Sequence, residues 1–558
     1  MVSTAQDTTQ TRPWLASYPE ELQWDIQLQG QALHDMLDST RRQHGDKTAM
    51  RFFGKTWTWE DIGCLSERLA RGLQELGYGK GSKIGLFLPN TPYYLISYFA
   101  IARAGATIVN FNPLYAEREI LHQIEDSNCD LMITLNLKAV YDKVAPMLDQ
   151  TRLNQILVCP FEQALPWYKG MAFSMFKRGE IADIPHTERH LWYGDMIDNA
   201  GTPDTPVIDP DEDLAVLQYT GGTTGLPKGA MLTHSNLTCN VEQCLHWFVD
   251  ARPGEEKMLG VIPFFHVFAM TAVLNLSVRA GFEIIALPRF ELRDTLKLIH
   301  KHKPEYFPAV PAIYNAIIND KQVNKYDLTS LKACISGGAP LPVEVKKRFE
   351  AVTGCVVVEG YGLTETSPVA CVNPLKGENR DGSIGLPLPA TDIDILDKDD
   401  RTTPVAQDEP GELCIRGPQV MKGYWKREDE TADTLRDGRM HTGDVAKIDG
   451  DGYLYIVDRI KDLIITNGYN VYPRHVEEAI YLHPAVEECI VAGLPDDKRG
   501  ERVKAWVKPH ASARLDAERL KGFLDDKISP IEMPREIEIR YEELPKTMIG
   551  KLSRKDVV

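Results

Sequence analysis

The chain has no paired cysteine motif and no long apolar run. Its ten cysteines include no C-x-x-C pair, and the closest two are Cys239 and Cys244. We therefore expect reduced, buried thiols rather than a disulfide framework or a cysteine metal site. No stretch reaches the roughly 18 apolar residues that a membrane-spanning helix requires, and residues 1–13 lack the apolar core of a signal peptide. These absences predict a cytoplasmic location.

The chain also carries less positive than negative charge. The formal net charge is −17 at pH 7, whereas a protein whose main partner is nucleic acid normally carries a basic surface. We therefore exclude nucleic acid as the main partner. The 558 residues, 43% hydrophobic and 26% charged, fit a soluble globular protein of at least two domains.

Apolar runs alternate with helical patterns, which predicts an α/β fold. Residues 84–88 and 106–111 read as strands, and a helix between them ends at Gly105. Charges gather just after the apolar run 455–457. We therefore predict a large N-terminal α/β domain of several subdomains over residues 1–458 and a small α+β domain over residues 459–558.

A glycine- and threonine-rich stretch follows the strand-like run 214–219. Glycines let backbone N–H groups turn toward an anion, and a lysine adds a mobile charge that suits phosphate. The stretch is not a Walker P-loop, because Pro227 precedes Lys228. We predict a phosphate-binding loop rather than a flexible surface loop. Its candidate nucleotide-binding residues are Thr220, Gly221, Gly222, Thr223, Thr224, Gly225 and Lys228.

A second motif spans residues 359–365 and follows a predicted strand at 354–358. Tyr361 offers a ring on which adenine could stack, Thr364 offers a hydroxyl, and Glu365 offers a hard oxygen ligand of the kind Mg²⁺ prefers. Alone, this motif is also typical of an ordinary strand-to-turn connection. Beside the phosphate loop, it indicates a nucleotide site.

Several further segments indicate a functional site only when they are considered together. They are the turn at 336–341, His266 in the apolar run 263–268, the 441–444 segment with Arg459 downstream, the loop at 467–473, and the lysine-bearing segment 545–554. Taken singly, they also fit a core histidine, a surface salt bridge or solvated lysines.

The order of these motifs resembles the adenylate-forming superfamily of acyl-CoA synthetases, adenylation domains and luciferases. The shared patterns are Y-T-x-G-T-T-G-x-P-K-G, Y-G-x-T-E, H-T-G-D and P-K-x-x-x-G-K, and they span residues 217–551. Gly221 stands where the family usually has serine. The form of the loop, with residues 112–115 and 119–120, is most similar to bacterial long-chain fatty acid–CoA ligases.

The resemblance implies a reaction in two halves. A carboxylic acid and Mg-ATP give an acyl-adenylate and pyrophosphate, and coenzyme A then takes the acyl group and releases AMP. The implied cofactor is Mg²⁺, held by Thr223 and Glu365, with ATP and coenzyme A as co-substrates. Lys551 becomes the catalytic lysine, His266 orients the acid, and Thr364 contacts the α-phosphate.

The remaining implied roles concern three sites. The nucleotide pocket adds Gly338, Ala339, Gly360, Tyr361, Gly362, Asp444, Ile456 and Arg459, with Asp444 and Arg459 on the ribose. The acyl pocket is formed by Phe265, Phe268, Ala272, Val310 and Gly337. The coenzyme A channel contains Gly468 and Tyr469, and the small domain is mobile about a hinge at Lys461.

Several alternatives stay open at this point. The acid could be aryl, short-chain or dicarboxylic, or the enzyme could stop at acyl-AMP. A luciferase-type oxygenase and a non-catalytic nucleotide sensor are further alternatives. The amphipathic segment 165–178 fits a surface helix packed on the body or a peripheral contact with the inner membrane face. A homodimer is also open.

Overall fold

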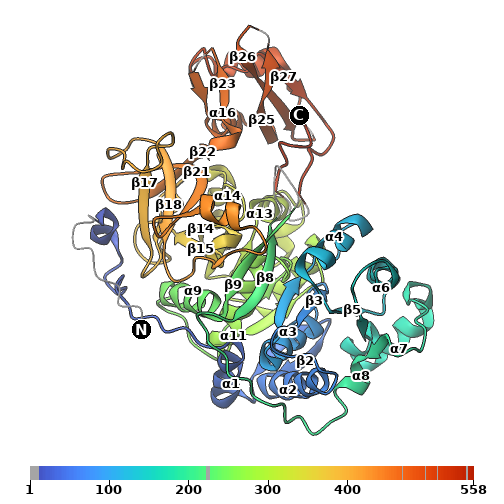
Figure 1. The fold of residues 1–558 in the computed structure, drawn as a ribbon. Coiled ribbons are helices and arrows are strands. Elements are labelled where there is room, and N and C mark those ends of the chain that lie inside the picture. The colour runs from blue at the N-terminus through green and yellow to red at the C-terminus, as the bar shows by residue number, and fades with distance from the viewer. Residues whose placement is uncertain (1–11, 221–226, 468, 497, 512, 548–550) are drawn as a thin grey trace.

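The computed structural model describes residues 12–220, 227–467, 469–496, 498–511, 513–547 and 551–558 (Figure 1). The predicted fold class is confirmed: a large α/β domain carries a smaller α+β domain at its C-terminal end. The hydrophobic cores are separate, because the main core ends at Leu454 and the C-terminal cores begin at Ile464. Between them lie β22 (Leu454–Arg459) and the short helix η7 (Ile460–Asp462).

Two large sheets organise the N-terminal domain. In the described part of the chain the first sheet has eight strands and the second has nine. The first, in spatial order, contains β19 (Gly423–Tyr424), β9 (Lys228–Thr233), β8 (Leu214–Thr220), β4 (Thr107–Asn110), β3 (Lys83–Phe87), β5 (Leu131–Leu135), β6 (Gln155–Cys159) and β7 (His190–Trp192). The second contains β16 (Leu386–Pro387), β15 (Val369–Val372), β14 (Val356–Gly362), β13 (Ala333–Ser336), β12 (Tyr306–Ala309), β10 (Lys257–Gly260), β11 (Glu283–Ala286), β1 (Thr48–Phe52) and β2 (Lys55–Thr58).

Helix α3 (Pro92–Ala104) lies at the centre of this domain, and all of its residues are buried. Tyr94 Oη bonds both Asn110 Oδ1 of the first sheet, at 2.7 Å, and the Phe264 carbonyl that follows β10 of the second, at 3.0 Å. The predicted stop at Gly105 is confirmed, because its φ of 83° ends the helix in a left-handed conformation that glycine adopts without strain.

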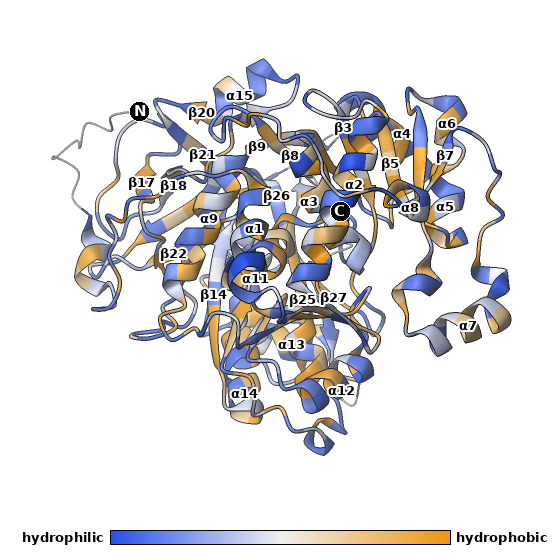
Figure 2. Cartoon of the chain, turned by 90° about the horizontal axis from the view of Figure 1, so that it is seen from below, coloured by the Kyte–Doolittle hydropathy of each residue, from blue (hydrophilic) through white to orange (hydrophobic). Residues whose placement is uncertain are grey.

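The other helices cover the sheets or connect their strands (Figures 1 and 2). They are α1 (Leu33–His44), α2 (Trp59–Glu75), α4 (Glu117–Ser127), α5 (Lys138–Val144), α6 (Met147–Gln150), α7 (Trp167–Phe176), α8 (Tyr193–Met196), α9 (His234–Trp247), α10 (Val267–Ala269), the π-helical η4 (Met270–Asn275), α11 (Leu276–Ala280), α12 (Leu292–His302), α13 (Pro311–Ile318), α14 (Val343–Thr353) and α15 (Glu428–Thr434). Short 3₁₀ turns are η1 (Pro13–Ser17), η2 (Phe161–Ala164), η3 (Arg178–Glu180), η5 (Val323–Lys325) and η6 (Thr364–Thr366). Within the described ranges, no helix is long and apolar enough to cross a bilayer.

Two smaller sheets complete the molecule. The first links the two domains and contains β17 (Asp392–Leu396), β18 (Gly411–Arg416), β21 (Arg439–Ile448), β20 (Leu435–Arg436) and β22. The C-terminal sheet contains β24 (Tyr469–Val471), β23 (Ile464–Thr466), β26 (Gly500–Pro509), β25 (Val486–Asp496) and β27 (Glu536–Ile539). Helices α16 (Pro473–Tyr481) and α17 (Ala517–Leu524) belong to the C-terminal domain. The cysteines are free thiols and nine of the ten are buried, as predicted.

Candidate active site

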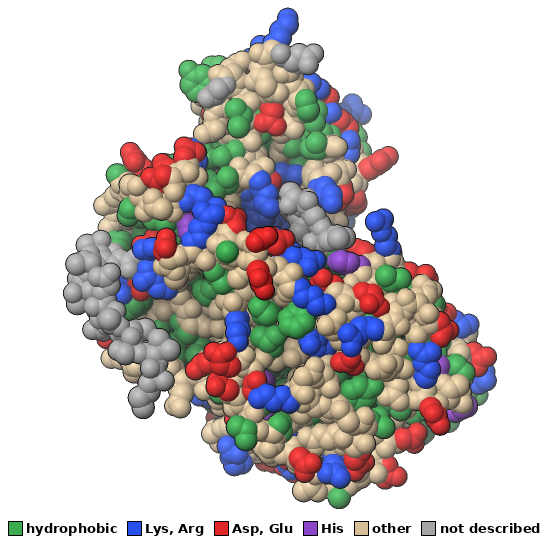
Figure 3. All heavy atoms as spheres, in the orientation of Figure 1, with side chains coloured by type: hydrophobic (Ala, Val, Ile, Leu, Met, Phe, Trp, Pro, Cys, Tyr) green, Lys and Arg blue, Asp and Glu red, His purple; other side chains and the backbone are tan. Residues whose placement is uncertain are grey.

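A cleft of about 3050 Å³ reaches from the large domain to the C-terminal domain. Lys and Arg side chains gather where the two domains meet (Figure 3), which suits an anionic ligand. Most of the predicted site residues line this one cleft. They are Thr220, Lys228, Phe265, His266, Phe268, Ala272, Gly337, Gly338, Ala339, Gly360, Tyr361, Gly362, Thr364, Glu365, Asp444, Ile456, Arg459, Lys461 and Lys551.

A few predicted residues are not brought to it. Val310 lines a small adjoining cavity with His266, Phe268 and Gly338. Tyr469 is 64% exposed and is not among the residues that line the cleft. The positions Gly221, Gly222, Thr223, Thr224, Gly225 and Gly468 lie outside the described residues, so their roles stay predictions.

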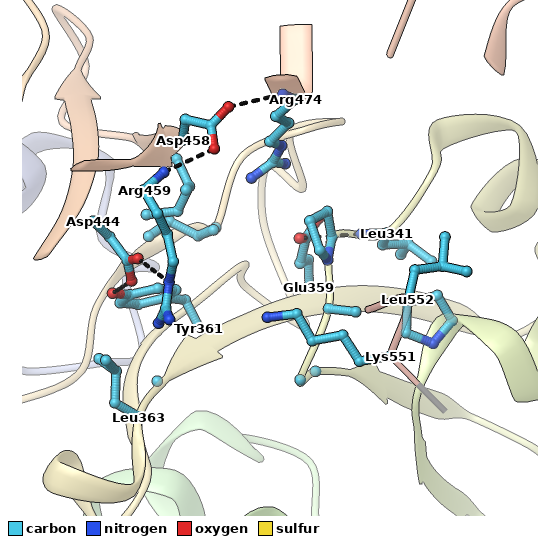
Figure 4. Close-up of a pocket in the computed structure, with 18 of the residues that line it drawn as sticks. Leu341, Glu359, Tyr361, Leu363, Asp444, Asp458, Arg459, Arg474, Lys551 and Leu552 are labelled. Atoms are coloured by element: carbon cyan, nitrogen blue, oxygen red, sulfur yellow. Dashed lines mark hydrogen bonds and ion pairs between the residues drawn. The ribbon is translucent and has the colours of Figure 1, made fainter. Parts of the chain in front are cut away.

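Tyr361, Asp444 and Arg459 form a bonded group on one wall of the cleft (Figure 4). Tyr361 Oη donates to Asp444 Oδ2 at 2.6 Å, and Arg459 Nε donates to Asp444 Oδ1 at 2.7 Å. Asp444 and Arg459 face each other in the β21–β22 pair. The strand that carries Tyr361 runs on to Gly362, beyond the predicted end at residue 358. A β-carbon at Gly362 would lie 1.8 Å from the Pro368 carbonyl oxygen, so this close pairing with β15 requires glycine.

The bulged part of β21 that carries Asp444 rests on a buried polar cluster. Glu412, Cys414 and His441 place their ligand-type atoms within 4.8 Å of one another. Glu412 already accepts from Arg401 Nε at 2.9 Å and from the Gly443 N–H at 3.1 Å, and His441 Nδ1 lies 2.9 Å from it. A paired guanidinium disfavours a cation there, so we interpret the cluster as support for the bulged part of β21.

Glu365 and Lys228 are linked through a residue that the sequence did not single out. Tyr424 Oη of β19 donates to Glu365 Oε1 at 2.6 Å, and Lys228 Nζ lies 5.0 Å from the centre of the Tyr424 ring. A carboxylate that lines the cleft beside Thr364 fits the oxygen-rich coordination that Mg²⁺ prefers. No local signal identifies Tyr424, because its role depends on a strand pairing with β9.

His266 stands at the N-terminus of α10. Its Nδ1 accepts from the Phe268 N–H at 3.3 Å, and burial lowers its pKa to about 4. The imidazole is therefore neutral at pH 7, and the accepting Nδ1 leaves the ring proton on Nε2. A neutral ring with one N–H can donate to a carboxylate oxygen without fixing a second charge in the cleft.

Part of the cleft has an apolar lining, which includes Phe268 and Ala272. The Phe268 ring packs directly on Gly337, where a β-carbon would lie 3.1 Å from a ring atom. The same cleft is also lined by the buried apolar residues Cys244, Trp247, Leu276, Val369 and Val372. The sequence alone missed these residues, because their identity as cleft lining depends on how α9, α11 and β15 pack together.

Lys551 enters the cleft from the C-terminal domain. Figure 4 shows its amine directed toward the wall that carries Tyr361, Asp444 and Arg459. Partial desolvation beside the cleft wall lowers its pKa, and the Arg459 cation acts in the same direction, although the residue as a whole stays exposed. Behind it, Arg554 holds the segment by donating to Glu477 at 2.7 Å and to Asp462 at 3.1 Å. Lys551 therefore lines the same cleft as Tyr361, Asp444 and Arg459, and its catalytic role stays a prediction.

Glu359 is a buried carboxyl at the same site, and sequence reasoning gave it no role. Burial raises its pKa to about 7, while the Arg474 cation and the Leu341 N–H act against that rise. The Leu341 N–H donates to its Oε1 at 3.3 Å. A glutamate in a motif carries no local sign of burial, so this property comes only from the packed structure.

Comparison with known proteins assigns the family. The AMP-binding enzyme model matches residues 37–425, and the AMP-binding enzyme C-terminal domain model matches residues 475–551. The fold and the cleft define an adenylate-forming enzyme, and the chain belongs to the AMP-binding enzyme family.

Individual relatives cover nearly the whole chain. It is similar to the long-chain-fatty-acid–CoA ligase of Bacillus subtilis (strain 168), with 44% identity over 547 residues, 98% of this chain and 97% of that protein. The Escherichia coli O6:H1 protein of the same name is 36% identical over 554 residues, with 98% and 97% covered. The crystal structure of ATP bound MatB from Rhodopseudomonas palustris has a TM-score of 0.82, with 26% identity over 94% of this chain and 98% of that one.

Proposed function

We propose that this protein is an ATP-dependent fatty acid–CoA ligase. It activates a medium- or long-chain fatty acid as acyl-AMP and then transfers the acyl group to coenzyme A, which yields acyl-CoA, AMP and pyrophosphate. The main supporting observation is that Lys551 of the small domain lines the same cleft as Tyr361, Asp444 and His266 of the large domain. One cleft thus holds groups for the nucleotide, the carboxylate and the developing phosphorus charge.

In the first half, the substrate carboxylate is the nucleophile, so no side-chain nucleophile is needed. The Nε2–H of His266 orients the carboxylate, and the carboxylate oxygen attacks the α-phosphorus as pyrophosphate leaves. Lys551 and Thr364 stabilise the negative charge that grows on the phosphoryl oxygens. Glu365 and Thr223 would hold Mg²⁺, which would neutralise charge on the nucleotide phosphates when bound.

In the second half, the coenzyme A thiol attacks the acyl carbonyl carbon, and AMP leaves. Lys551 occupies the cleft in the present arrangement, whereas Tyr469 lies outside it. A rotation of the small domain about Lys461 would exchange the lysine segment for the loop that contains Gly468. Such a hinge motion lets one cleft serve two reactions.

The preference for an extended acyl chain is supported by the apolar part of the cleft lining around Ala272. Its buried residues, which include Phe268 and Trp247, offer apolar surface to methylene groups. The Trp247 N–H already donates to the Asn373 carbonyl at 3.0 Å, so the indole adds no unsatisfied polar group to this lining. The cytoplasmic location and the homodimer stay predictions.

The test is AMP release by the purified protein with ATP, Mg²⁺ and coenzyme A across a panel of acids. The panel runs from acetate to oleate and includes benzoate, ferulate and a dicarboxylate. A maximum at medium or long chains is expected. A maximum at an aryl or dicarboxylic acid would overturn the acid class, and acyl-AMP accumulation without thioester would overturn the second half.

A further inference from the structure

Helix α7 (Trp167–Phe176) presents an apolar stripe to solvent. Trp167 is 79% exposed and Phe176 is 82% exposed, and Tyr168, Met171 and Met175 are each more than half exposed. Trp167, Met171 and Met175 follow one another at i, i+4 and i+8, and Tyr168 lies on the adjacent row, so these four share one face, while Phe176 is exposed at the C-terminal end of the helix. Elsewhere among the described residues, exposed large hydrophobic side chains do not gather five to a single helix. Such a patch on a protein surface marks an interaction site.

The opposite face of α7 fixes the helix to the body. A β-carbon at Gly170 would lie 2.4 Å from the Glu162 carbonyl oxygen, so the backbone approaches η2 closely. Phe173 meets Phe161 edge-on with ring centres 5.2 Å apart, and Lys169 Nζ donates to the Phe53 carbonyl at 2.7 Å. The helix is packed on the body, as expected of a surface helix, but its apolar stripe is left outside the core.

Helix α7 lies at the periphery of the molecule (Figures 1 and 2). The exposed cations Lys177 and Arg178 follow its C-terminal end, in a chain whose net charge is −17, and Lys177 Nζ lies 3.7 Å from the carboxylate of the exposed Glu180. The polar tips on the stripe are those of Trp167 and Tyr168, residue types that favour the headgroup level of a bilayer. Aromatic and methionine side chains beside basic residues are typical of helices that lie in the plane of an anionic membrane surface.

We propose that α7 docks this enzyme on the surface of an anionic lipid bilayer. The stripe from Trp167 to Phe176 inserts at the headgroup boundary, and Lys177 and Arg178 contact the lipid phosphates. This inference rests on the proposed function, because a fatty acid substrate partitions into the same bilayer. Docking brings the enzyme to the bilayer, where its fatty acid substrate is concentrated. The rest of the negatively charged protein surface stays in water.

The test is co-sedimentation of the full-length protein with phosphatidylcholine vesicles, with and without phosphatidylglycerol. The parent protein should bind the anionic vesicles, and the double variant Met171→Asp/Phe176→Asp should lose about tenfold or more in partition coefficient. Both positions are exposed, so folding is preserved. The matched control is Val207→Asp, which changes an 88% exposed hydrophobic residue away from α7 and should bind as the parent does. The charge variant Lys177→Glu/Arg178→Glu should bind anionic vesicles more weakly, and added salt should reduce its difference from the parent.

Two results would overturn the proposal. One is equal binding of the parent and the Met171→Asp/Phe176→Asp variant. The other is a concentration-dependent dimer in sedimentation velocity that this variant abolishes without any vesicle binding by the parent, since a second copy would then cover the stripe. Coenzyme A-dependent AMP release with octanoate, in vesicle-free buffer, should be equal in all variants. Loss of that activity in the parent would contradict the proposed function and not the docking surface.

Discussion

The buried carboxyl of Glu359 makes the stability of the large domain depend on pH in a defined direction. Burial raises its pKa to about 7 from the ordinary value of 4.5, against the cations of Arg474 and Lys346 and together with the carboxylate of Glu478. The folded state therefore binds this proton more tightly than the unfolded state does. Stability is then lost as the pH rises from about 4.5 to about 7, because the carboxyl must ionise while it is buried.

The isosteric variant Glu359→Gln removes this titration. At about 1.4 kcal/mol for each pH unit, the difference between the two pKa values corresponds to about 3 kcal/mol. Most of that window lies between pH 5 and pH 8, so we expect the variant to gain about 2–3 kcal/mol relative to the parent over this range. For a protein of this size, the change amounts to a few degrees in Tm.

The assay compares the Tm of the parent and the variant from pH 5 to pH 8. The exposed position Glu20→Gln in the same domain serves as the matched control and should follow the parent throughout. The reasoning would be refuted if the Glu359→Gln and parent curves stayed parallel. A gain that appears toward acid pH instead would show that Glu359 is ionised and stabilised in the folded state.

The remaining predictions concern the chemistry of the cleft. Lys551→Ala should slow acyl-AMP formation about 10²–10³-fold and leave thioester formation from supplied acyl-AMP nearly intact. The control Lys546→Ala removes an amine outside the wall that carries Tyr361, Asp444 and Arg459, and it should slow neither step. Equal loss in both half-reactions would contradict the role of Lys551. Ala272→Trp should block the apolar part of the cleft and lower kcat/KM by about fourfold for each excluded methylene. Activity with oleate should therefore fall far more than activity with butyrate. An equal fall for both acids would show that the acyl chain binds elsewhere. Tyr424→Phe removes a hydrogen bond to the Glu365 carboxylate and should raise the Mg²⁺ concentration for half-maximal rate by about tenfold, measured at fixed ATP; an unchanged Mg²⁺ curve would contradict Glu365 as a metal ligand.

Local patterns account for much of the fold. The strand before the phosphate loop and the helix that stops at Gly105 were predictable, because apolar periodicity and a glycine C-cap are properties of short segments. The strand through Tyr361 was predicted to end too early. Its extension depends on pairing with β15 and on the bond to Asp444, which lies 83 residues away in the chain.

The sequence by itself determined the family, the order of the motifs and the identity of residues such as Lys551, because these depend on residue types at short spacings. Only the tertiary structure decided which of them meet. Lys551 reaches the wall that carries Tyr361, Asp444 and Arg459 because a separate C-terminal domain contributes it to the cleft. The apolar part of the cleft lining, the raised pKa of Glu359 and the exposed stripe of α7 were also decided there. Each of these features depends on which residues are buried or exposed. Burial and exposure arise from contacts between segments distant in sequence, so no single segment predicts them.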